Sequence, residues 1–398
     1  MLMLSLVAST AFLGGVSYMH ASSERGIPPW ARKYNMNCSG CHYPAPPRLN
    51  ATGLRFRWAG YRMPEDIGKD QEMDRVSNYL GTRARFQYVY EKPSGGPAST
   101  SEFSLPDVTV FYAGAYGRNF GGLLEVAKEE DETEFGAQVF GVWGGERNHG
   151  GFRVGQTHML LNAGVAGFDR PVGINAPTPV AGPVTTAIPF SFAGDQAGLE
   201  AFYVTGSNRV SGQLFNGLGL GPDGTSRKKD FVLTDQFLLD GRGSGVIGTA
   251  YYGTVSGLDP GQEDLTSHFW RVGLSANKIM SDFEALGGVV FGKDLDLPVG
   301  GLSPFLTPTN RGLGYWFSGQ YYFGGDKGPP LTLFARYEFV DPDTDTDEDA
   351  SRRYVLGSVL PITLPEYLRL AAEYWLDNPQ GAGAPKQNNI AAEVMLSF

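Results

Sequence analysis

The sequence predicts an all-β protein, an antiparallel β-barrel of about sixteen strands that follows a small helical segment. Apolar and polar residues alternate with a period of two in one run after another between residues 80 and 398. Glycine (55 residues) and aromatic residues (13%) are abundant, while charged residues make up only 19% of the chain. Short and long connections also alternate between the runs. Together these features favour a closed sheet.

Each run separates an apolar face from a polar one. Leu331, Leu333 and Phe339 share one face of a run, whereas Arg336 and Glu338 lie on the other. Charged side chains require water or ionic partners, while apolar side chains require lipid or a core. The predicted strands are residues 81–91, 105–116, 118–127, 133–145, 149–161, 197–206, 208–217, 230–240, 244–255, 267–278, 281–292, 311–323, 331–340, 351–360, 365–376 and 387–398.

The connections are typical of a bacterial outer-membrane barrel, which has short periplasmic turns and longer outer loops. Tight turns are expected at residues 116–118, 206–208, 240–243 and 279–281, and longer connections at 162–196, 293–310 and 341–350. The terminal Phe398 resembles the C-terminal signal of such barrels. Residues 162–196 are long enough to fold inward and narrow the aqueous lumen that sixteen strands enclose, and a loose surface loop is the alternative. A soluble sandwich or propeller is the alternative, but repeats are absent and the chain is long for a sandwich.

The N-terminal residues 1–23 resemble a secretory signal peptide. An apolar run at residues 2–16 is followed by small and polar residues, with cleavage expected after Ala21 or Ser23. A retained membrane anchor is the alternative, although the run is short for a span. The net charge of −10 argues against nucleic acid as a partner.

The motif Cys38-Ser39-Gly40-Cys41-His42 has the C-x-x-C-H spacing of a c-type haem attachment site. Two thiols at this spacing can add to the two vinyl groups of one porphyrin, and His42 then ligates the iron as the proximal ligand. Cys38 and Cys41 are the only cysteines, so a zinc site lacks its remaining ligands. A redox dithiol would need a βαβ context, which is absent. The motif therefore predicts one covalent haem c.

The predicted monohaem cytochrome segment covers residues 24–65, with a linker at 66–80 and the barrel at 81–398. Asn50 is expected to cap a short helix that ends near Gly60, and a second short helix is predicted at residues 70–79. Leu54, Phe56 and Trp58 of the first helix are expected to pack on the porphyrin. About forty residues are too few to enclose a haem. We therefore expect the segment to plug the barrel lumen.

Met63 is the predicted distal ligand of the haem iron, because the chain can return over the porphyrin after the first helix. A His–Met pair would raise the reduction potential relative to a His–His pair. Met36 lies too close to the attachment site to reach round the ring. His149, His158 and His268 in the barrel, or a water molecule, remain the alternatives.

Two acidic runs fall in predicted outer loops, at residues 129–132 and 341–349. Carboxylates are hard oxygen ligands that suit Ca²⁺ or Fe²⁺, and their field concentrates cations. We predict a loop cation site at Asp343, Asp345 and Asp347. A solvated loop, or a loop that binds lipopolysaccharide through divalent ions, is the alternative.

The whole layout resembles the fused outer-membrane monohaem cytochrome–porins of iron-oxidising bacteria. The resemblance is most specific at a set of residues around the haem motif. They are Trp30, Ala31, Arg32, Cys38, Cys41, His42, Pro47, Leu49, Asn50, Gly53, Phe56, Gly60 and Tyr61. The chain departs from the family at Trp30, where Phe is expected, and at Lys33 and Tyr34, where a Gln-Thr-like pair is expected.

The resemblance implies electron transfer across the cell outer membrane, with extracellular Fe(II) as donor and a periplasmic c-type cytochrome or other soluble carrier as acceptor. An iron(II) oxidoreductase activity would follow. The family departures leave the direction of electron flow open. An outward conduit to extracellular acceptors is one alternative. A diffusion porin whose haem plug serves as a gate or redox sensor is another.

Overall fold

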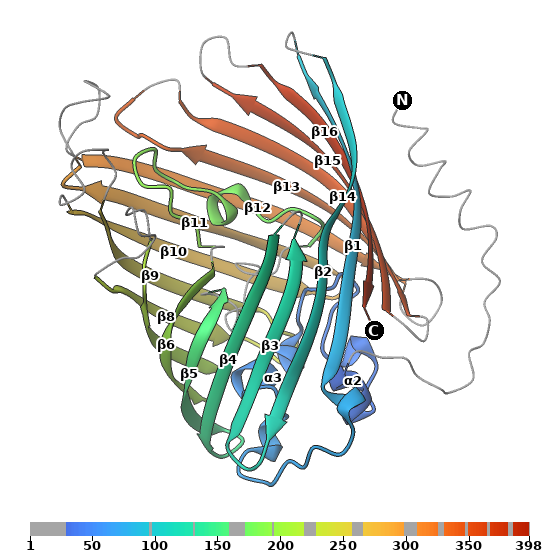
Figure 1. Cartoon of the computed structure of the whole chain (residues 1–398). Helices are drawn as coiled ribbons and strands as arrows, with labels where there is room; N and C mark the ends of the chain where they lie inside the picture. Colours follow the sequence, from blue (N-terminus) through green and yellow to red (C-terminus); the bar gives the residue numbers. More distant parts are fainter. Residues whose placement is uncertain are drawn as a thin grey trace, which may run out of the picture.

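The computed structural model describes residues 29–94, 98–129, 132–158, 172–192, 195–218, 228–256, 266–297, 309–324, 330–346, 349–363, 367–380 and 385–397. The predicted signal peptide and Phe398 lie outside these residues. The described strands form one closed antiparallel barrel in which sequence neighbours pair and β1 pairs with β16 (Figure 1). The predicted antiparallel barrel and its strand number are confirmed.

The observed strands correspond one to one with the predicted runs. The largest difference in bounds is at β2, which begins at Thr100 where the predicted run begins at residue 105. The strands are β1 Leu80–Pro93, β2 Thr100–Tyr116, β3 Phe120–Glu129, β4 Glu132–Gly144, β5 Asn148–His158, β6 Asp195–Thr205, β7 Asn208–Phe215, β8 Asp230–Leu238, β9 Gly245–Ser256, β10 Thr266–Met280, β11 Phe283–Leu295, β12 Thr309–Phe323, β13 Leu331–Asp341, β14 Ser351–Thr363, β15 Tyr367–Pro379 and β16 Gln387–Ser397.

The outer face of the barrel wall is apolar, whereas its inner face carries buried charged and polar side chains together with apolar ones. On β13, Arg336 and Glu338 are buried, whereas Leu333, on the opposite face of the same strand, is 43% exposed. Phe231 and Phe317 on other strands are 59% and 61% exposed. This arrangement inverts that of a water-soluble domain, since the exposed outer surface is the hydrophobic one.

The two ends of the barrel differ in their connections. Tight turns join β2 to β3, β4 to β5, β6 to β7, β8 to β9 and β10 to β11, and we call this end the short-turn end. At Gly206 the turn has φ +60°, a left-handed conformation that glycine adopts without strain. The opposite long-loop end carries the connections from β5 to β6, β11 to β12 and β13 to β14. The named tight turns and longer connections are confirmed at opposite ends, but the alternation is incomplete, because only residues 130–131 join β3 to β4 at the long-loop end.

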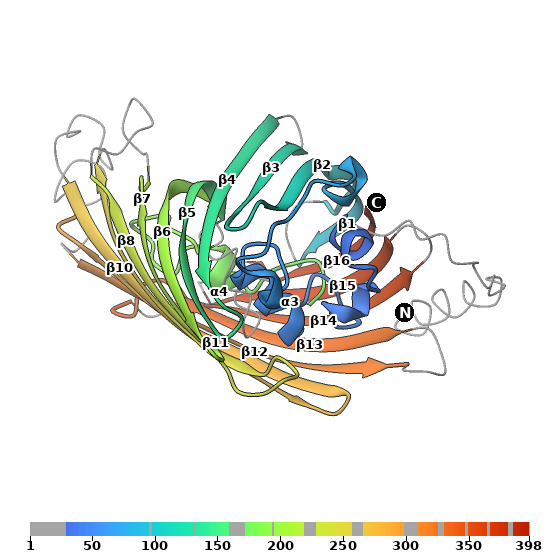
Figure 2. The ribbon, with the colours of Figure 1, turned by 90° about the horizontal axis from the view of Figure 1, so that it is seen from below.

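The N-terminal segment, residues 29–79, lies at the short-turn end, where α3 sits inside the ring of strands (Figure 2). Its elements are α2 Pro29–Tyr34, η1 Cys38–Gly40, α3 Ala51–Trp58, η2 Pro64–Asp66 and η3 Val76–Asn78. The predicted helix after Asn50 is confirmed as α3. The helix predicted at 70–79 is wrong, since only the single 3₁₀ turn η3 forms there. Among the described residues, no helix is long and apolar enough to cross a membrane.

An inner loop, residues 172–192, leaves the wall between β5 and β6 and folds into the lumen with the short helix α4, Thr178–Ala181. Glu338 of β13 accepts a hydrogen bond of 2.7 Å from the backbone nitrogen of Thr178. Glu373 of β15 accepts one of 2.6 Å from the side chain of Asn175. The described part of the predicted inward fold is therefore confirmed, and wall carboxylates hold it in place.

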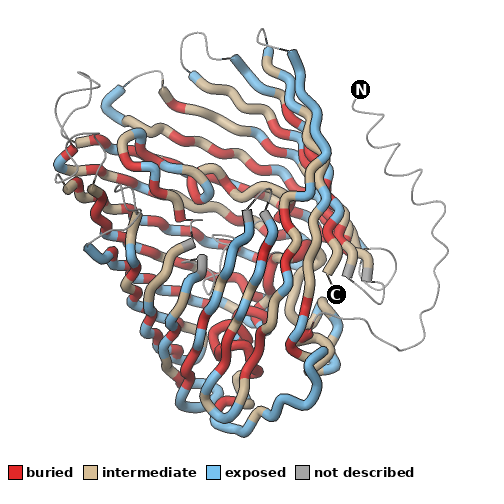
Figure 3. Tube along the Cα trace, viewed as in Figure 1, coloured by how far each residue is buried: buried red, intermediate tan, exposed pale blue. Residues whose placement is uncertain are grey.

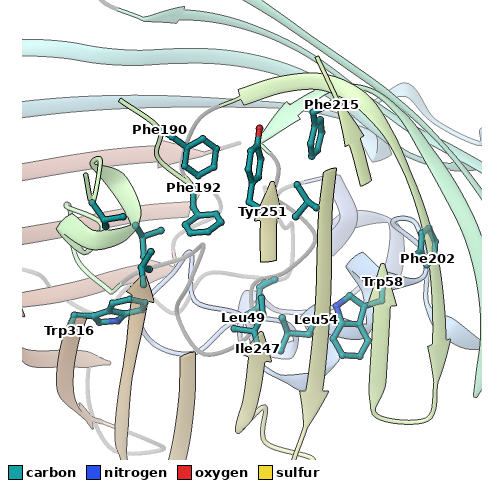
Figure 4. Close-up of a cluster of buried hydrophobic side chains, with 14 of the residues drawn as sticks. Leu49, Leu54, Trp58, Phe190, Phe192, Phe202, Phe215, Ile247, Tyr251 and Trp316 are labelled. Carbon is teal, nitrogen blue, oxygen red and sulfur yellow. The ribbon is translucent and has the colours of Figure 1, made fainter. Parts of the chain in front are cut away.

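An apolar cluster inside the lumen joins the N-terminal segment, the inner loop and the wall. Leu54 and Trp58 contribute from α3, and Phe190 contributes from the inner loop (Figure 4). The rings of Phe190 and Tyr251 on β9 have centroids 4.2 Å apart. Figure 3 shows buried residues both on the wall and in the N-terminal segment. The described part of the lumen is thus packed with apolar side chains at this level.

Candidate functional site

The C-x-x-C-H motif forms one compact turn at the start of the site. The backbone nitrogens of Cys41 and His42 both donate to the carbonyl of Cys38, at 3.1 and 2.9 Å. Burial raises the pKa of the Cys38 and Cys41 thiols above their ordinary value. Both side chains are free cysteines that stay protonated at neutral pH. The turn therefore presents two neutral thiols and one imidazole side by side, the groups that a c-type haem uses.

Helix α3 supports this turn from one side. The Asn50 side chain caps the helix by accepting a 3.0 Å hydrogen bond from the Gly53 nitrogen. The same side chain donates to the carbonyls of Ser39 and Gly40, at 3.2 and 3.1 Å. A Cβ at Gly53 would lie 2.4 Å from the Cys41 carbonyl oxygen, so only glycine fits there. Helix start and haem motif are thus one folded unit.

A buried ion pair fixes the segment to the wall. Arg48 lies 2.6 Å from the Glu284 carboxylate of β11, and both side chains are fully buried. Asn277 and Tyr322 also donate to Glu284, each at 2.6 Å. A buried charge pair is favourable only when its remaining hydrogen-bonding capacity is satisfied, as these contacts help to ensure.

Further hydrogen bonds join the segment to neighbouring strands. The Arg62 guanidinium donates to the carbonyls of Arg118 and Phe120 at the β2–β3 turn, both at 2.5 Å. The indole nitrogen of Trp30 donates to the Ala113 carbonyl of β2 at 3.2 Å. The N-terminal segment is therefore attached to opposite parts of the wall and is not a free tail.

A cavity of about 810 Å³ lies between the N-terminal segment and the wall at the short-turn end. This volume falls within the range of about 300–1,000 Å³ that is usual for cofactor pockets. The segment lines it with Met36, Thr52, Arg55, Trp58, Met63, Pro64 and Glu65, and the wall with residues 146–149 and 204–207. Cys38, Cys41 and His42 are not among its lining residues, and the motif approaches it through Met36, whose methyl carbon would lie 2.6 Å from a Cβ at Gly40.

Two of the sequence candidates for the distal ligand, Met63 and His149, line this cavity, and so does Met36, which the sequence analysis set aside. His268 does not, because it lies near the long-loop end of β10, where its Nδ1 is 3.0 Å from the Tyr252 hydroxyl. The side chain of His158 lies outside the described residues. The prediction of Met63 remains a prediction, with two competitors in the same cavity.

The residues of the cavity fit a haem. Trp58 and Val204 provide apolar surface for the porphyrin, and Arg55 and Arg147 provide guanidinium groups that suit its propionates. Trp58 lines the cavity and also belongs to the lumen cluster, and its packing on a porphyrin stays a prediction. Leu54 instead packs in the lumen cluster, and Phe56 packs against the ring of Trp30, with centroids 5.3 Å apart. Sequence reasoning missed Arg147, because its place at the lumen mouth follows only from barrel closure.

The acidic loop lies between β13 and β14 at the long-loop end. The backbone nitrogen of Asp345 donates to the Asp343 carboxylate at 3.2 Å, while Asp347 lies outside the described residues. Burial, together with repulsion from Asp341 and Asp343, raises the pKa of Asp349. Among the described residues, no group of three or more metal-ligating side chains is arranged to hold a metal ion. The loop cation site therefore remains a sequence prediction.

The barrel is similar to solved outer-membrane channels. An anion-selective porin from Comamonas acidovorans matches with a TM-score of 0.58 and 12% identity, over 80% of this chain and 98% of that one. The channel DcaP of Acinetobacter baumannii matches with a TM-score of 0.54 and 12% identity, over 80% and 96%. A loop L8 deletion mutant of OmpT from Vibrio cholerae gives 0.52 and 14%, over 80% and 99%.

At these identities the likeness shows the porin-like barrel fold alone. The matches leave a fifth of this chain uncovered. No protein-family model matches the sequence, and no curated protein matches it either.

Proposed function

We propose that the chain is an outer-membrane c-type cytochrome–porin that carries single electrons across the membrane. The observation that carries the proposal is the C-x-x-C-H turn, which belongs to the segment at the short-turn end of the barrel, near a cavity whose residues fit a porphyrin. Cys38 and Cys41 would hold the haem and His42 would ligate its iron. The outward apolar band and the likeness to outer-membrane porins support a place in outer-membrane lipid.

When bound, the haem would supply a one-electron couple. The chain would position it, since the Asn50 cap and Gly53 fix the attachment turn and Arg48 ties the segment to the wall. Trp58 and its apolar neighbours would exclude water from the porphyrin. Electron transfer without bond formation requires proximity and a suitable potential, so no catalytic acid or base is assigned.

The cavity lies near the short-turn end, which we assign to the periplasm by the usual orientation of such barrels. A periplasmic cytochrome or other soluble carrier could then approach the haem directly. One haem cannot span about 30 Å of hydrocarbon, so an extracellular donor must reach into the long-loop mouth. The family resemblance makes Fe(II) the preferred donor, because insoluble ferric product must form outside the cell. Outward flow to an external acceptor uses the same geometry.

A second candidate is a diffusion porin whose haem plug acts as gate or redox sensor. Its support is the likeness of the barrel to outer-membrane channels, one of them an anion-selective porin. The apolar cluster that joins the N-terminal segment, inner loop and wall argues for a narrow path through the described lumen. Solute flux separates the two functions.

The test uses liposomes that carry the purified protein and enclose an oxidised soluble c-type cytochrome. Fe(II) is added outside, and reduction of the enclosed cytochrome is followed by absorbance. An enclosed iron(II)-chelating dye, in parallel liposomes, reports any entry of the metal itself. We expect reduction without dye colour. Cys41→Ala should fold as a barrel but lose haem and reduction, whereas Tyr252→Phe, near the long-loop end, serves as matched control.

Reduced cytochrome inside and a ferric complex outside test the opposite direction. If neither arrangement moves electrons, the electron-transfer proposal is wrong. If dye colour and sugar-driven swelling appear and change with haem redox state, the diffusion porin is the better account.

A further inference from the structure

One polar side chain in the cavity wall is arranged unlike the others. His149 is the second residue of β5 and only 3% exposed. Its Nδ1 lies 3.1 Å from the backbone carbonyl oxygen of Gly145. Because a carbonyl oxygen only accepts hydrogen bonds, Nδ1 carries the proton of the neutral ring. Nε2 then has its lone pair free to accept a donor or bind a metal.

Nε2 of His149 is buried and accepts no hydrogen bond from any residue in the described ranges. The backbone carbonyl of Trp58 lies within hydrogen-bonding reach of the ring, but as an acceptor it has no proton to give to the Nε2 lone pair. Buried nitrogen atoms are nearly always satisfied in native proteins, so an exception requires an explanation such as a bound ion or ligand. The ring is therefore oriented by one nitrogen and unsatisfied at the other, as metal-binding histidines are before they take their metal.

The two methionines of the cavity need no hydrogen-bond partner to be buried. Met63 belongs to an apolar cluster with Phe56, Tyr61 and Phe140. Met36 packs in the same cluster and against Gly40. A thioether behaves as an apolar group, so these contacts suffice for its burial. Imidazole requires a polar partner, and the thioethers do not.

We propose that Nε2 of His149 is the distal axial ligand of the haem iron, in place of Met63. The inference rests on the proposed function, since it requires a haem on Cys38 and Cys41. The ring donates its lone pair to the iron and the Gly145 carbonyl fixes its tautomer. One ligand then comes from the N-terminal segment and the other from the barrel wall, so the iron links the two. A His–His pair has a lower reduction potential than a His–Met pair.

The test is spectroscopic and uses the full haem-loaded chain in detergent. Ferric spectra of the unaltered protein distinguish a His–His haem from a His–Met haem, because only the latter has the thioether charge-transfer band. His149→Ala should convert low-spin ferric haem to high-spin, and added imidazole should restore the low-spin spectrum. Met63→Leu and Met36→Leu are matched controls that keep shape without the thioether, and both should stay low-spin.

His149→Gln is made in parallel, because it preserves side-chain volume if the alanine variant folds poorly. Heat-modifiable migration on gels confirms folding of each barrel. The proposal is overturned if Met63→Leu becomes high-spin while the His149 variants stay low-spin. It is also overturned if the unaltered protein shows the thioether band or is high-spin. A protein that carries no haem at all would instead refute the proposed function, so the two failures are distinguishable.

Discussion

Removal of Arg48 is expected to release the N-terminal segment from the barrel wall. The Arg48 guanidinium lies 2.6 Å from Glu284, and neither side chain is exposed. Asn277 and Tyr322 continue to hold the Glu284 carboxylate when the arginine is gone. In Arg48→Ala the docked state therefore contains a buried negative charge that has lost its ionic partner.

The magnitude follows from this burial. Loss of one partner from a buried ion pair costs about 3–5 kcal/mol, and 1.4 kcal/mol is about a factor of ten in a population. The fraction of molecules with a displaced segment should rise by about two to three and a half powers of ten. Solute leakage should rise with it, because the displaced segment no longer fills the short-turn end.

The assay is native-state cleavage by chymotrypsin within residues 29–79, under conditions where the rate follows the population of the open form. Lys69→Ala is the matched control, since Lys69 is 64% exposed and its contact to Asp66 is 3.6 Å long. Surface pairs of this kind contribute about 0–1 kcal/mol. Equal cleavage rates for Arg48→Ala and Lys69→Ala would refute the role of the buried pair. A smaller effect of Arg48→Ala in a Glu284→Gln background would support it.

Three further predictions concern the motif, the lumen and the thiols. Gly53→Ala should reduce haem attachment and destabilise the N-terminal segment by about 1–3 kcal/mol, because the added Cβ would lie 2.4 Å from the Cys41 carbonyl oxygen. Thr52→Ala is the control, and equal haem content in the two variants would contradict this prediction. Phe190→Ala should increase the flux of sugars through the barrel into liposomes, because the substitution opens the apolar cluster. Phe231→Ala, on the outer face, is the control. Equal liposome swelling with the two variants would argue against a packed lumen. In haem-free protein at pH 8, iodoacetamide should alkylate Cys38 and Cys41 more slowly in the folded state than in urea, because burial raises the pKa of both thiols and fewer thiolates form. The difference between the two rates should shrink as the pH rises. Equal rates at pH 8 would count against buried thiols.

The barrel could be predicted from the sequence because its determinants are local. Alternation with a period of two marks each strand, and Arg336 and Glu338 can only face inward once Leu333 faces lipid. The haem turn and the Asn50 cap are also local patterns. The failure at residues 70–79 has a tertiary cause, since η3 packs against α2 and β1 and no helix extends from it.

The cavity could not be predicted in the same way, because its residues come from distant parts of the chain. Arg147 lies in the turn between β4 and β5, and His149 is the second residue of β5. Their position beside Trp58 and Met63 depends on closure of the barrel and on docking of the N-terminal segment. The buried partner of Arg48 is likewise set by the register of β11. Such long-range pairs leave no signal in the spacing of one sequence.

Mass spectrometry of one tryptic peptide tests the central claim, a covalent haem on the turn at the short-turn end of the barrel, most directly. Cleavage after Lys33 and Arg48 releases residues 34–48, which contain both cysteines. In protein produced by a host that matures c-type cytochromes, this peptide should carry the mass of one haem joined by two thioether bonds. An unmodified peptide from a correctly folded barrel would contradict the account.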